Sequence, residues 1–154
     1  YAIIRETKGF VINLTTEDLT WATDYCGVRS GRDVDKFAET GLTPEKAQHL
    51  NYAPVIEESP VNIECRVLEI KELGTHHMFL AEVVGVSVDE AYLDEKERFD
   101  LNRTGLVAYS HGSYMTLGEA CGSFGYSVRR KKRKPESGRR KAQQKRKAER
   151  WNRK

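Results

Sequence analysis

The residues with the clearest potential for chemistry lie together in positions 30–37, with the sequence SGRDVDKF. Gly31 lets the backbone turn, or approach a ligand, without a Cβ in the way. Ser30 and the amides near Gly31 are donors at an expected helix start, where a negative charge is favoured. Arg32 and Lys36 add two cations within about one helical turn. The segment predicts an anion-binding turn, and the alternative is a capped helix whose charges are solvated.

The elements expected to position this turn are a strand before it and a helix on each side. In residues 9–14, Phe10, Ile12 and Leu14 fall on one face of a strand. Thr15 or Thr16 can cap a following helix whose apolar residues recur at helical spacing up to Cys26. Thr43 and Pro44 suit the cap and first position of a further helix.

A long antiparallel hairpin is predicted after these segments. Residues 61–73 alternate, with Asn62, Glu64, Arg66 and Leu68 opposite the apolar side formed by Val61, Ile63, Cys65 and Val67. Gly74 turns the chain into a second strand over 75–88, and a shorter strand follows at 106–109. Strands of this length suit a barrel wall.

The order and spacing of these segments resemble the flavin reductase-like family, the FMN-binding split barrels that include flavoredoxins. The resemblance covers residues 1–128 and rests on the Phe-x-x-Asn strand, the Asp-Lys-Phe triplet ending at Phe37, the Ala-Pro segment at 53–54 and the closing Tyr-x-x-Leu-Gly at 114–118. It implies a mainly β split barrel with short helices. The family places its first strands before the position of Tyr1. We therefore expect a barrel that lacks its first strands, and residues 1–154 alone to aggregate or to lack flavin.

The resemblance also assigns residues to the needs of a flavin, which are cations for the phosphate, walls for the ring and a donor near N1 and O2. Lys36 stands where the family places a lysine against the flavin. Ser30, Gly31 and Arg32 form the binding turn in this interpretation. His76 follows Gly-Thr as the family's flavin-contacting histidine does, and an exposed lysine or a solvated loop histidine is the alternative.

Three further aromatic residues are candidates for the wall of the ring or for a loop that closes over it. Tyr109, His111 and Tyr114 cluster around Gly112, and ordinary packing at the barrel end is the alternative. No metal site is predicted, because His76, His77 and His111 have no carboxylate or cysteine at useful spacing. A serine hydrolase is also excluded, because Ser110 and His111 lack a Gly-x-Ser-x-Gly elbow.

Charge divides the chain into two parts with opposite signs. Residues 129–154 contain 15 Lys or Arg and 2 Glu, a formal +13, whereas residues 1–128 carry a formal −10. We therefore predict a partial split-barrel domain over 1–128 and a disordered basic tail over 129–154.

The three cysteines have no metal-binding spacing and predict free, buried thiols in a reducing cytoplasm. No apolar run is long enough to span a membrane.

The function that the resemblance implies is an FMN-dependent flavin reductase or a flavoredoxin-like oxidoreductase. It transfers hydride or electrons through bound FMN, takes them from NAD(P)H or a small redox protein, and works as a homodimer. The alternative is a non-catalytic protein that binds nucleic acid without sequence preference through residues 129–154.

Overall fold

The computed structural model describes residues 1–129, and these are mainly β with short helices. The predicted tail therefore lies outside the described residues, apart from Arg129. The chain divides into two units, Tyr1–Gly118 and Glu119–Lys154. The second unit contains the short 3₁₀ helix η3 (Tyr126–Val128). The first unit holds every predicted site residue and is described below.

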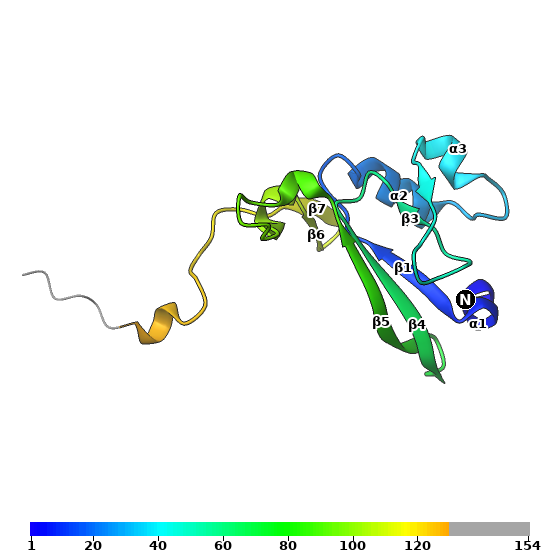
Figure 1. Ribbon diagram of the computed structural model, residues 1–154. Helices are drawn as coiled ribbons and strands as arrows, with labels where there is room; N and C mark the ends of the chain where they lie inside the picture. The colour runs from blue at the N-terminus through cyan, green and yellow to red at the C-terminus, as the bar shows by residue number, and fades with distance from the viewer. Residues whose placement is uncertain (130–154) are drawn as a thin grey trace, which may run out of the picture. The chain divides into compact units, whose positions relative to one another are not determined.

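A three-stranded antiparallel sheet in the order β1-β4-β5 is the centre of the first unit. It consists of β1 (Gly9–Asn13), β4 (Val61–Glu72) and β5 (His77–Val88), which confirms the predicted first strand and the long hairpin. The sheet is open among the described residues, with β1 and β5 at its edges. In Figure 1 the β4–β5 turn lies at the end of the sheet near α1 (Ala2–Thr7).

Two smaller hairpins and two helices complete the unit. Strands β2 (Pro44–Glu45) and β3 (Val55–Ile56) pair, and β6 (Val107–Ser110) pairs with β7 (Ser113–Thr116). The helices are α2 (Thr20–Val28) and α3 (Lys36–Thr40). The charged excursion after β5 forms two 3₁₀ turns, η1 (Glu90–Tyr92) and η2 (Leu101–Thr104). No helix among residues 1–129 is long and apolar enough to cross a membrane.

Four local predictions are wrong, three of them because a tertiary partner or a nearer cap competes. Thr16 does not cap α2; it bridges Leu106, and the helix begins four residues later. Pro44 does not open a helix, because β2 is paired with β3. Asp35, not Ser30, caps α3, since its carboxylate accepts the amides of Phe37 and Ala38. Cys121 is exposed rather than buried.

The core lies where β4 passes beneath the loop of residues 46–59, and both faces of β4 are buried there. Val61 and Cys65 are buried on the predicted apolar side. Asn62 and Glu64 are buried on the side predicted to be polar. Asn62 exchanges hydrogen bonds with the backbone of Ile56, and Ser59 donates to the carbonyls of Leu14 and Val61. These bonds attach the crossing loop to the sheet and satisfy its buried polar groups.

Candidate functional site

The predicted anion-binding turn is a compact loop between α2 and α3. The amides of Asp33 and Val34 donate to the Ser30 carbonyl, and the Arg32 amide donates to the Ser30 hydroxyl over 3.2 Å. Residues 31–36 alone line an open pocket of about 590 Å³ at this turn. A Cβ built on Gly31 would come within 4 Å only of the Lys36 side chain, so the backbone there is approachable.

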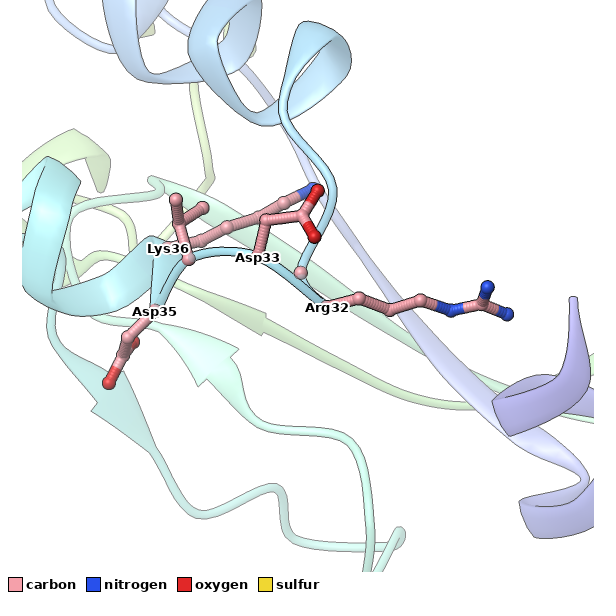
Figure 2. Close-up of a pocket in the computed structure, with 6 residues that line it drawn as sticks. Arg32, Asp33, Asp35 and Lys36 are labelled. Atoms are coloured by element: carbon pink, nitrogen blue, oxygen red, sulfur yellow. The ribbon is translucent and has the colours of Figure 1, made fainter.

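Lys36 lies back from the turn toward α2. Its ammonium group donates to the Cys26 carbonyl over 2.6 Å, in the last turn of α2. Figure 2 shows the Lys36 stem running past the side chain of Asp33. An ammonium group carries three donors, so one bond to a carbonyl leaves two for a ligand. Lys36 thus joins α3 to α2 and keeps a positive charge at the edge of the pocket.

Arg32 is the more accessible cation of the turn. It forms no salt bridge among residues 1–129, and Figure 2 shows its guanidinium extending away from the loop. Asp35 is occupied as a cap, whereas Asp33 adds a nearby negative charge. Two cations, a free hydroxyl proton on Ser30 and an approachable backbone fit the phosphate of a flavin nucleotide.

The tyrosine hairpin β6–β7, which carries Tyr109 and Tyr114, contacts α2, the helix that the Lys36 ammonium group also reaches. Tyr109 and Tyr114 face each other across the hairpin, edge to face, with ring centroids 5.0 Å apart. The Tyr114 hydroxyl donates to Asp24 of α2 over 3.2 Å. Partial burial, the Asp24 carboxylate and Tyr109 together raise the pKa of Tyr114. His111 and Gly112 both have positive φ, which makes a two-residue turn that presents His111 at its tip.

His76 lies in the turn between β4 and β5, far from the other candidates. Its Nδ1 is 2.8 Å from the Thr75 hydroxyl, whereas the next residue, His77, stacks on Tyr1 with centroids 3.9 Å apart. The strand β4 is 12 residues long and separates this turn from the end of the central sheet where β6 and β7 lie. At about 3.3 Å per residue, the length of the strand is roughly 40 Å. One chain therefore brings the turn and the tyrosine hairpin to α2 but does not bring His76 to them (Figure 1).

A buried carboxylate on β4 does not follow from the sequence pattern. Glu64 is only 2% exposed, and it accepts the amides of His49 and Gln48 over 2.7 and 3.0 Å. His49 Nδ1 lies 3.5 Å from the same carboxylate. A Cβ on Gly85 would overlap the His49 ring, so any larger residue at this point of β5 would require that ring to move. Strand alternation cannot reveal this cluster, because the loop that covers Glu64 folds back from the segment before β4, and the pattern within β4 does not show this.

Replacing Glu64 by Gln is expected to lower the free energy of unfolding at pH 7 by about 2–3 kcal/mol, since a buried, charged acceptor of two part-buried amides is lost. Burial opposes ionisation, but the backbone amides of His49 and Gln48 hold the pKa of Glu64 below its usual range. The folded pKa is thus below the unfolded one, and the stabilisation is complete above the unfolded pKa. The difference in free energy of unfolding between wild type and Glu64→Gln should therefore shrink as the pH falls through the folded pKa of Glu64.

Urea unfolding of both proteins across a pH series measures this effect. The matched control is Glu69→Gln, which removes a half-exposed partner of Lys71 and is expected to cost less than about 0.5 kcal/mol. An equal loss for both variants, or a Glu64→Gln deficit that persists unchanged at acidic pH, would contradict the assignment.

Comparison with known proteins identifies the sequence family. A family model described as "Flavin reductase like domain" matches residues 1–118. The flavoredoxin of Desulfovibrio vulgaris (Miyazaki F) is 30% identical with a TM-score of 0.75, over 84% of this chain and 69% of that one. An FMN-binding protein from Thermus thermophilus is 25% identical with a TM-score of 0.63, over 79% and 65%.

A curated relative gives a similar result over a shorter span. The reductase component of a 4-nitrophenol 4-monooxygenase/4-nitrocatechol 2-monooxygenase from Rhodococcus opacus is 34% identical over 89 residues, which cover 54% of this chain and 41% of that protein. Two other curated relatives are matched over 56% and 64% of their lengths. The chain thus spans less than two thirds of the curated relatives it matches.

Proposed function

Since the chain belongs to the flavin reductase-like domain family, we propose that it forms the FMN-binding part of a flavin-dependent oxidoreductase. The observation that carries the proposal is the pocket of residues 31–36, which combines an approachable backbone with Arg32 and Lys36. When bound, FMN supplies the hydride and electron chemistry through its ring. NAD(P)H or a small redox protein is the proposed donor.

The residues of the chain have separate tasks in this proposal. Arg32 and the Ser30 hydroxyl hold the phosphate, and Lys36 places a positive charge where the ligand meets α2. Tyr109 and Tyr114 supply an aromatic wall, with Tyr114 fixed by its bond to Asp24. His111 lies at the tip of that hairpin and covers the ligand from one side.

The test of this proposal is an FMN titration of the gene product that contains these residues. We expect quenching of FMN fluorescence that saturates at one FMN per subunit, and NADH or NADPH oxidation that depends on added FMN. A protein without flavin absorbance, and without quenching at saturating FMN, would exclude the proposal.

We further propose that the working form is a homodimer in which His76 of one subunit completes the site of the other. The support is that a single chain keeps His76 at the far end of β4 and β5 from the turn. Mixing Lys36→Ala and His76→Ala subunits is expected to restore FMN sites of wild-type affinity, because each mixed dimer has one intact site. A monomer in light scattering, or no recovery on mixing, would contradict this arrangement.

A second candidate function rests on residues 129–154 alone. Their formal +13 favours non-specific binding to nucleic acid through counterion release. This function does not compete with flavin binding, because the two proposals use different residues.

A further inference from the structure

A second pocket lies away from the predicted flavin residues, at the beginning of β1. It has a volume of about 310 Å³ and is lined by residues 7–9, residues 49–53 and Arg66. None of these residues belongs to the turn of residues 30–36 or to the tyrosine hairpin. Three segments far apart in the sequence therefore meet around one cavity.

The wall made by residues 49–53 is fixed by contacts within the chain. The buried Glu64 carboxylate holds the amides of Gln48 and His49. Gly85 leaves room for the His49 ring, and Gly9 leaves room for Leu50, whose Cδ2 is 3.2 Å from a Cβ built on Gly9. Such a wall does not need to be ordered when a ligand enters, which lowers the entropic cost of binding.

The lining of this pocket includes two cationic residues, Lys8 and Arg66, which favour an anion. Arg66 lies between Gly9 on β1 and Glu82 on β5 in the sheet register. Its contact with Glu82 is 3.6 Å between half-exposed groups, which is a weak pair that a carboxylate ligand can replace. Lys8 has a left-handed backbone conformation and forms no salt bridge within residues 1–129. A guanidinium and an ammonium group in the lining of one pocket suit a carboxylate.

The rest of the lining is apolar and aromatic. Leu50 and Ala53 line the cavity, and Tyr52 is 74% exposed at its edge. Tyr52 has no aromatic partner in the described part of the chain, so its ring is available to a ligand. We propose that this pocket binds a small aromatic carboxylate, with the carboxylate at Lys8 and Arg66 and the ring against Leu50 and Tyr52.

Calorimetric titration of the gene product that contains these residues, with three probes, tests the proposal. Benzoate carries both the charge and the ring, acetate carries only the charge, and benzamide carries only the ring. We expect benzoate to bind at least about tenfold more tightly than either of the others, since each lost contact weakens binding by about this factor. Equal affinities for benzoate and acetate, or for benzoate and benzamide, would overturn the proposal, as would no heat with benzoate.

Variants locate the binding. Arg66→Gln and Lys8→Gln are each expected to weaken benzoate at least about tenfold, while Tyr52→Leu reduces the preference for benzoate over acetate. The matched control is Lys71→Gln, a cation on the same strand but outside the pocket. Arg32→Gln is a second control, because it changes the turn proposed for FMN. If Lys71→Gln weakened benzoate binding as much as Arg66→Gln does, binding would depend on general charge. If Arg32→Gln did so, benzoate would bind at the flavin turn. Either result would exclude this pocket.

Discussion

Replacing Lys36 by alanine is expected to weaken FMN binding about ten- to a hundredfold, because one charge-assisted contact contributes about 1.5–3 kcal/mol. The same change removes the bond of 2.6 Å from the ammonium to the Cys26 carbonyl. That bond joins α3 to the last turn of α2, so the loop between them also loses a constraint. Weaker FMN binding by Lys36→Ala would therefore combine the loss of a positive charge with a change in the position of the loop.

A second substitution separates the two effects. Lys36→Gln removes the charge but keeps an N–H donor on a shorter side chain, and Lys71→Ala removes a lysine from the far end of β4. We expect both Lys36 variants to weaken FMN in fluorescence titrations, and Lys71→Ala to leave its affinity unchanged. FMN affinities and flavin potentials that match wild type in both Lys36 variants would remove this residue from the site.

The β-strands were predictable because their information is local. Residues 9–13 are a short, mostly apolar run and residues 61–72 alternate, and the hairpin around Gly74 follows from two strand-like runs and one turn. The register shifts near Cys65 and Leu68 were not predictable, because each extra residue is accommodated only once the partner strand is in place. The helix predicted at Pro44 shows the same limit, since only the pairing with Val55 and Ile56 selects a strand.

The candidate site was predictable as a set of residue types, but its arrangement was not. Ser30 and Asp35 are both good caps, and the amides of Phe37 and Ala38 select Asp35. No pattern within residues 30–37 predicts that the Lys36 ammonium reaches Cys26. Only the family resemblance groups His76 with Lys36, and the length of β4 separates them in one chain. Sequence thus predicts which groups are present, whereas the tertiary contacts decide which of them meet.

The largest expected effect concerns residues 129–154, whose formal +13 should bind DNA without sequence preference. If about eight of these charges meet phosphates, log K should fall with log salt at a slope near −7. The affinity should then drop about ten-thousandfold between 50 and 200 mM salt. Trp151 is the only aromatic residue of the segment, so stacking adds little and single strands should not be strongly preferred.

Anisotropy titrations over a salt series, on the intact chain and on a chain ending at Val128, measure this prediction. The deletion is expected to abolish binding, and in the gene product that contains residues 1–154 it should leave flavin reduction unchanged. A shuffled version of residues 129–154 is the matched control, because it keeps the charge and should retain both the affinity and the slope. Binding that survives the deletion would place the nucleic-acid site in the acidic residues 1–128. Loss of binding on shuffling would mean that the order of the residues matters, which counterion release alone does not require.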